Sequence, residues 1–263
     1  MLRVRRRRHR PDEEGVSRLR FGGAGVVLLL APLLLFGFGP RAARRVVDAS
    51  LRLSPAALKS VLAAHRRDVD RGFEEVLSEG GGRSRKELVE RLGGERARAP
   101  RLFRERAPFA AVAHSFGRMA GWVWLLNDPF LENGRPALRE VEGDYARYVE
   151  RKLPLLVLSF DGWRTPPLDG DLAAYFERRA LFSERYLRAL ETCYYPQGKR
   201  VSSETFDDRS NAFGVAQAAL SHAASDIAKV WVSAWGEMGG DLSAAPFGGP
   251  PPPDPAGPEG ARP

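Results

Sequence analysis

The residues that could support acid–base or metal chemistry are few in this chain, and two of them share one helical face. His222 and Asp226 lie four positions apart in the run 210–235, whose mixture of small and large apolar residues predicts a long buried helix. An imidazole nitrogen and a carboxylate oxygen together suit zinc. Polar groups on a buried helix must otherwise be paired, either with each other or with separate partners. The sequence leaves both interpretations open.

His114 is the third candidate, in the apolar stretch from Phe109 to Leu126. Arg118 follows one helical turn later on the same face, so its guanidinium would repel a cation, bind a phosphate or pair with Asp226. Gly117 between them permits close contact with another helix. A lone histidine on an apolar helix is more often a satisfied core residue than a ligand, and this alternative is kept.

Composition excludes several other kinds of chemistry. The chain has 263 residues, 43% of them hydrophobic, which is enough for a core, and its one cysteine, Cys193, excludes an intrachain disulfide or a cysteine-rich metal site. No G-x-S-x-G, P-loop or G-x-G-x-x-G motif is present. The net charge of +8 is concentrated in residues 1–20, where eight arginines face three acidic residues, so nucleic-acid binding is not favoured.

The two ends of the chain differ in character from its middle. Residues 21–39 are 19 uncharged, mostly apolar residues that would span about 28 Å as a helix, roughly one bilayer core. They predict a signal peptide or signal anchor, preceded by a basic cytoplasmic head, 1–20. The rest of the chain is then exported, either anchored to the inner membrane or released as a periplasmic or extracellular protein. Residues 246–263, with eight prolines and four glycines, predict a disordered tail.

Residues 41–245 predict a single all-α domain. A helix is expected to begin at Ser54-Pro55 and stop at Gly80, and a capping box from Ser84 to Glu87 opens a short helix that ends at Gly93-Gly94. Further helices are expected at Phe109–Leu126, Leu138–Leu153, Asp171–Leu190 and Ser210–Trp235. Asp207-Asp208 is expected to cap the last of them, and Leu155–Phe160 is the only plausible strand.

Three segments resemble the zinc-dependent phospholipase C and single-strand-specific nuclease-like family. RAPFAAVAHSFGRMAGWVWLLNDPF (106–130) resembles its central helix, and SSETFDDRSNAFGVAQAALSHAASDIAKVWVSAWGEMGGD (202–241) resembles its last helix with the His-x-x-x-Asp motif. FGPRAARRVVDASLRLSPAALKSVLAAH (38–65) is similar to its mature N-terminus. The resemblance implies a helical bundle with up to three zinc ions, and phosphodiester hydrolysis by a metal-bound hydroxide. It also implies that His114, His222 and Asp226 are zinc ligands.

The chain departs from the family pattern at most other ligand positions. Phe38 replaces the N-terminal tryptophan, Ala43 replaces a histidine, and Arg118 replaces a metal-bridging aspartate. Three further ligand positions of the family carry Gly121, Leu125 and Leu131. Carboxylates could come from a separate group, namely Asp68, Asp70, Glu74 and Glu75. The resemblance therefore implies a degenerate site that holds at most one zinc ion.

Two functional hypotheses follow. The preferred one is an exported, membrane-tethered, phospholipase-C-like domain that is non-catalytic, with Arg118, Asp226 and His222 in a buried polar network. The alternative is an active zinc-dependent phosphodiesterase, with one zinc on His114, His222 and Asp226, an open fourth position, and a phospholipid or another phosphodiester as substrate. In both, residues 21–39 bring the chain to a membrane, and no protein partner is indicated.

Overall fold

The structure, a computed structural model, describes five stretches of the chain. They are residues 38–79, 82–131, 133–163, 171–243 and 245–248. Within these stretches the chain forms nine α-helices and no strand, which confirms the all-α prediction. The predictions for the basic head, for residues 21–37 and for the tail beyond residue 248 lie outside the described residues.

The first five helices occupy residues 40–126. They are α1 (Pro40–Leu53), α2 (Ala56–Ala64), α3 (Arg66–Glu79), α4 (Arg85–Arg104) and α5 (Phe109–Leu126). The expected single helix after Ser54 is divided at His65, and Ser54 is the C-cap of α1. The predicted capping box between Ser84 and Glu87 is present, and α5 has its predicted limits.

The predicted end of α4 at Gly93-Gly94 is wrong. The helix continues through both glycines and through Pro100 to Arg104. Leu88, Leu92 and Ala99 are fully buried along it. Each glycine costs about 1 kcal/mol relative to alanine in a helix interior, and burial of this apolar stripe outweighs that cost.

The remaining helices occupy residues 136–237. They are α6 (Pro136–Arg139), α7 (Glu142–Lys152), α8 (Leu172–Tyr194) and α9 (Asn211–Glu237), with 3₁₀ turns η2 (Leu153–Leu155), η3 (Pro196–Gly198), η4 (Ser203–Thr205) and η5 (Pro246–Gly248). The predicted strand at Leu155–Phe160 is instead a 3₁₀ end followed by irregular chain. Ser210 caps α9 by accepting from the Phe213 amide, in place of the predicted Asp207-Asp208.

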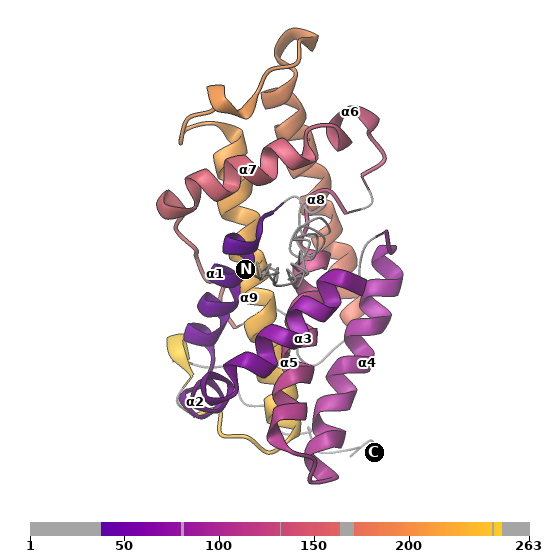
Figure 1. Cartoon of the computed structure of the whole chain (residues 1–263), viewed down its shortest axis with the longest axis vertical. Helices are drawn as coiled ribbons and strands as arrows, with labels where there is room; N and C mark the ends of the chain where they lie inside the picture. The colour runs from indigo at the N-terminus through magenta and orange to yellow at the C-terminus, as the bar shows by residue number, and fades with distance from the viewer. Residues whose placement is uncertain (1–37, 80–81, 132, 164–170, 244, 249–263) are drawn as a thin grey trace, which may run out of the picture.

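The last helix, α9, is the central element of the bundle. It packs against α1, α4, α5, α7 and α8, and Figure 1 shows it running along the long axis of the molecule. Its alanines let these neighbours approach, while Trp231 is fully buried and donates its indole N–H to the Phe116 carbonyl of α5 at 2.8 Å. A polar residue at its middle is therefore enclosed by protein.

Glycines hold α3 and α5 at close range. A Cβ atom at Gly117 would lie 2.0 Å from the Val69 carbonyl oxygen, and one at Gly72 would lie 2.1 Å from the His114 carbonyl oxygen. Neither distance is possible for real atoms, so only glycine fits at these two positions. The close contact expected from Gly117 is thus present, and it fixes His114 against α3.

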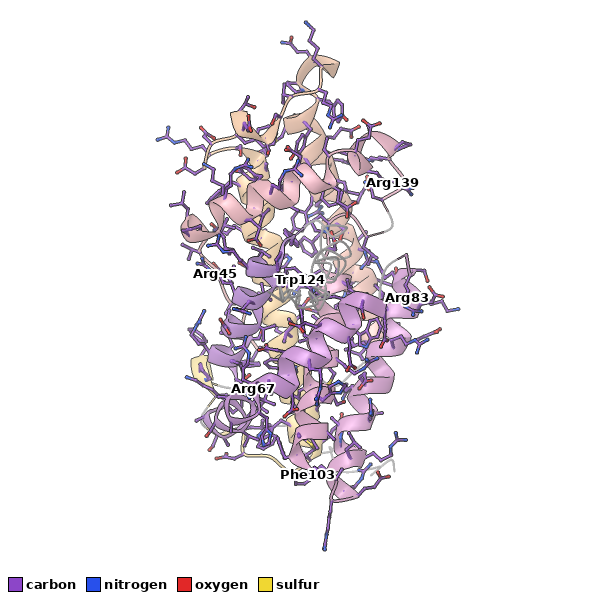
Figure 2. All side chains as sticks on the ribbon, viewed as in Figure 1. Arg45, Arg67, Arg83, Phe103, Trp124 and Arg139 are labelled. Atoms are coloured by element: carbon purple, nitrogen blue, oxygen red, sulfur yellow. The ribbon has the colours of Figure 1, made fainter. Side chains whose placement is uncertain are left out.

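The described chain begins inside the core. Phe38 is 3% exposed, and its ring centroid lies 5.4 Å from that of Trp124 and 6.1 Å from that of Tyr145. Figure 2 labels Trp124 near the middle of the molecule. The chain therefore enters the domain through packed aromatic side chains at the start of α1.

None of the helices in the described part of the chain has the length and apolarity needed to cross a membrane.

Candidate functional site

Asp226 lies at the centre of α9 and is saturated by protein donors. Its side chain is fully buried. Arg179 of α8 donates to it from Nε at 3.0 Å and from Nη2 at 2.5 Å. The Tyr175 hydroxyl donates to one carboxylate oxygen, and Asn127 Nδ2, at the C-cap of α5, donates to the other at 3.1 Å. These four contacts satisfy a carboxylate that burial would otherwise strongly disfavour.

A second carboxylate extends this arrangement. Arg179 Nη2 also donates to Asp161 at 2.7 Å, and the ammonium group of Lys229, whose side chain is fully buried, donates to the other Asp161 oxygen. We call Tyr175, Arg179, Asp226, Asp161 and Lys229 the Asp226 cluster. It contains two carboxylates and two cationic side chains, so its charges balance within the protein.

The pKa values of Arg179, Asp161 and Tyr175 in the Asp226 cluster are shifted in the directions that keep these groups in their present protonation states. Burial opposes the charge on Arg179, but Asp226 more than compensates and raises the pKa of the guanidinium. Burial likewise opposes ionisation of Asp161, but the hydrogen bond from Lys229 lowers its pKa. Burial and the Asp226 charge both raise the pKa of Tyr175, so its hydroxyl stays protonated and remains a donor.

His222 lies one turn before Asp226 but has a different partner. Its Nδ1 is 3.1 Å from the Tyr186 hydroxyl, and its ring meets the Phe182 ring edge-on at a centroid distance of 5.1 Å. Burial lowers the pKa of His222, and the charge of Arg179 lowers it further, so the imidazole is neutral at pH 7. The two residues are thus separately satisfied core groups, one of the alternatives left open above.

An open pocket of about 250 Å³ lies beside His222. Its wall includes His222, Ser221, Asp161 and Gln217. The Ser221 hydroxyl makes two hydrogen bonds. It donates to the Gln217 carbonyl at 2.7 Å and accepts from the Ser159 amide at 3.0 Å. No side-chain base contacts this hydroxyl in the described part of the chain.

His114 belongs to a second group of charged residues. Its Nε2 lies 2.9 Å from a carboxylate oxygen of Glu75 on α3. Arg118 contacts the same Glu75 at 3.3 Å, Glu79 at 3.0 Å and Glu95 of α4 at 2.7 Å. We call His114, Arg118, Glu75, Glu79 and Glu95 the Arg118 cluster. It joins α3, α4 and α5.

Electrostatics in the Arg118 cluster favour the ionised forms of Arg118, Glu75 and Glu79. Hydrogen bonds to Glu79 raise the pKa of Arg118 despite partial burial, and the same contacts lower the pKa of Glu79. Burial opposes ionisation of Glu75, but His114 and then Arg118 lower its pKa. Arg118 thus pairs with three carboxylates near α5, and the predicted network of Arg118 with Asp226 and His222 is not formed.

The three proposed zinc ligands do not converge. Asn127, which contacts Asp226, lies 13 positions beyond His114, or about 20 Å along the α5 axis. Zinc ligands lie about 2 Å from the ion. In the part of the chain that the structure describes, no group of three or more His, Cys, Asp or Glu residues could hold a metal. His114, His222 and Asp226 as arranged do not fit one zinc ion, and zinc binding stays a prediction.

Sequence reasoning missed the partners of Asp226. Arg179 lies four positions after Tyr175 and three after Phe176, so it falls on the buried stripe of α8. An arginine on an apolar stripe indicates a buried cation that needs an acidic partner. In a chain so rich in arginine, this position did not stand out. Glu75, one of four carboxylates considered, does contact a histidine.

Comparison with models of protein families, with characterised proteins and with solved structures gives no match to this chain.

Proposed function

We propose that this chain is a membrane-tethered, exported helical domain of the phospholipase C type, and that it is non-catalytic. One observation carries the proposal, namely that protein donors occupy both carboxylate oxygens of Asp226. A guanidinium 2.5 Å from the carboxylate takes the place that a metal ion needs, and repels the ion.

The Asp226 cluster resists displacement of Arg179 by a metal ion. If a cation displaced Arg179 from Asp226, a guanidinium that is almost completely buried would lose a partner. Removing one partner of a buried ion pair costs about 3–5 kcal/mol, and less where a second carboxylate remains, as Asp161 does for Arg179. A zinc ion at this site would have to offset that cost with fewer ligands than a catalytic site uses.

The tether is proposed from the sequence. Residues 21–39 carry no charge, and eight arginines precede them, so the head stays in the cytoplasm and the helical domain is exported. The domain begins before this run ends, because Phe38, its second-to-last residue, is already packed against Trp124, which leaves residues 21–37 for the proposed span. A tether this short would hold α1 close to the membrane.

The experiment uses the full chain in neutral detergent micelles, incubated with zinc and then dialysed. We expect far less than one zinc per chain by elemental analysis, and no hydrolysis of phosphatidylcholine or bis-p-nitrophenyl phosphate above background. One zinc per chain that is lost in His222→Ala but kept in His65→Ala, together with hydrolysis, would overturn the proposal in favour of the zinc phosphodiesterase. The tether is tested separately by retention of the chain in membranes washed with alkaline carbonate.

A further inference from the structure

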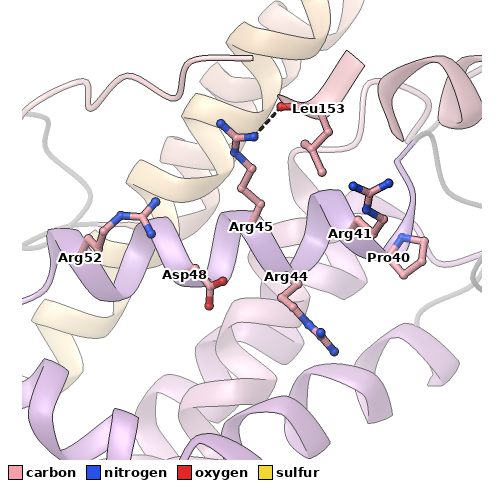
Figure 3. A pocket seen from close by; sticks show the side chains of 7 residues that line it. All are labelled: Pro40, Arg41, Arg44, Arg45, Asp48, Arg52 and Leu153. Atoms are coloured by element: carbon pink, nitrogen blue, oxygen red, sulfur yellow. Dashed lines mark hydrogen bonds between the residues drawn. The ribbon is translucent and has the colours of Figure 1, made fainter. Parts of the chain in front are cut away.

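The outer face of α1 carries a stripe of arginines. Arg41, Arg44, Arg45 and Arg52 follow one another at helical spacing, while the opposite face, which includes Val46 and Val47, is buried. Figure 3 shows the four guanidinium groups spaced along α1. They line an open groove of about 580 Å³, completed by Pro40, Asp48 and Leu153.

The groove has little negative charge of its own. Its one acidic residue, Asp48, already pairs with Arg66 of α3. Arg41 has a carboxylate of Glu150 at 3.9 Å, near the limit for an ion pair, and its side chain is 71% exposed. Arg44 and Arg52 are also exposed. The groove therefore presents a net positive surface to an anionic ligand.

Two exposed aliphatic side chains belong to the segment that Arg45 holds against α1. Arg45 donates to the carbonyls of Leu153 at 2.5 Å and Leu156 at 2.6 Å, which fixes the segment after α7 against α1. In that segment Leu155 is 56% exposed and Val157 is 65% exposed. Cationic groups next to unburied aliphatic groups are typical of a surface that lies at a membrane interface.

The position of the groove in the chain identifies its ligand. Pro40, the first residue of α1, directly follows the apolar run 21–39, and α1 is about 21 Å long. Phe38, near the end of this run, is already packed in the core two residues before α1 begins. If the run enters a bilayer, the arginine groove lies within reach of the lipid head groups.

We infer that the α1 groove binds the phosphate groups of anionic phospholipids in the membrane that anchors the chain, with Leu155 and Val157 at the acyl boundary. The inference rests on the proposed tether. Basic side chains near an anionic bilayer contribute about 1 kcal/mol each, or about fivefold in binding. The exposed residues Arg41, Arg44 and Arg52 together then contribute on the order of 100-fold.

The test measures how lipid protects arginines from phenylglyoxal in the full chain, mapped by mass spectrometry. The chain is reconstituted in vesicles of phosphatidylcholine alone or with 30% phosphatidylglycerol. We expect modification of Arg44 and Arg52 to slow by about fivefold or more with phosphatidylglycerol, and this protection to vanish at 0.5 M salt. Arg178, exposed on α8, is the internal control and should not change.

The remaining arms separate the ligand sources. Inorganic phosphate at 10 mM with phosphatidylcholine vesicles should not protect Arg44; equal protection there would show a free-phosphate site and overturn the lipid assignment. Protection of Arg44 by added duplex DNA equal to that by phosphatidylglycerol would overturn it in favour of nucleic acid. If the chain stays in the membrane after the carbonate wash but its arginines are modified at equal rates in both lipid mixtures, the proposed lipid binding by the groove is disproved. The proposed tether is then unaffected.

Release of the chain by the carbonate wash would disprove the tether. The groove can then be tested independently by adding vesicles to the released chain. Protection that depends on phosphatidylglycerol would support the groove, and its absence would overturn it. In either case, Arg44→Gln with Arg52→Gln should reduce the lipid dependence of Arg41 modification, because two of the three exposed arginines of the groove are lost. Both residues are exposed on the outer face of α1, so the pair is expected to leave the helical circular dichroism unchanged.

Discussion

Substituting Arg179 by methionine tests whether the Asp226 cluster is the structural centre of the bundle. Arg179 makes the two charge-assisted hydrogen bonds to Asp226, and the other two donors, Tyr175 and Asn127, are neutral. Such bonds are worth about 1.5–3 kcal/mol each, and stranding a buried charge costs about 3–5 kcal/mol. We therefore expect Arg179→Met to lower the free energy of unfolding by about 4 kcal/mol.

The assay is urea and thermal unfolding followed by circular dichroism at 222 nm. For a domain of this size, about 4 kcal/mol corresponds to a fall in Tm of roughly 8–16 °C. Asp226→Asn should cost less, about 1–2 kcal/mol, because Arg179 keeps its contact with Asp161. Arg178→Met, at an exposed position on the same helix, should change stability by less than about 0.5 kcal/mol.

The relative losses of stability of these variants decide whether the reasoning holds. A loss below about 1 kcal/mol in Arg179→Met would refute the reasoning, because a pair that contributes so little cannot stabilise the bundle or resist a metal ion. Arg179→Lys should recover only part of the loss, since a lysine has no planar fork to contact Asp226 and Asp161 together.

Three further predictions concern packing, pH and capping. Gly117→Ala should destabilise the domain by about 1–3 kcal/mol or more in urea unfolding, because its Cβ would overlap the α3 backbone. Gly94→Ala, with open space around the position, should instead stabilise it by up to about 1 kcal/mol. Burial and the charge of Asp128 raise the pKa of Glu142 from 4.5 to about 8, so the folded state holds a proton that the unfolded chain has lost. Stability should therefore fall as pH rises from 4.5 to 8, by less than about 1.4 kcal/mol per unit, and a profile of Tm against pH with the same slope in Glu142→Gln would contradict this. Ser84→Ala removes the capping box of α4 and should lower the free energy of unfolding by about 1 kcal/mol in the same assay. An unchanged free energy of unfolding would indicate that the start of α4 frays in solution.

Local signals in the sequence predicted some helices accurately. The start of α4 was readable from Ser84 and Glu87, and the limits of α5 from its apolar run and the Asn127 that follows. The failures came where tertiary packing outweighed a local preference. Gly93 and Gly94 suggested a helix end, yet burial of the residues around them carries the helix onward.

The candidate site was predictable in its residues but not in its pairings. The sequence indicated that His222 and Asp226 share a face and that polar groups there need partners. It did not indicate that α8 would supply Arg179, since helix spacing relates residues within one helix and not across two. The same limit explains Arg118, whose three carboxylate partners come from α3 and α4.

The central position of α9 also determines the order in which the domain can fold. Contacts among α3, α4 and α5 join neighbouring stretches of chain, so this part can form early. In contrast, Ser50 of α1 donates to the Ala224 carbonyl, 174 positions later, so the apolar side of α1 must wait for the last helix. A chain that is interrupted before α9 therefore leaves the apolar side of α1 uncovered, so the folded bundle requires the completed α9.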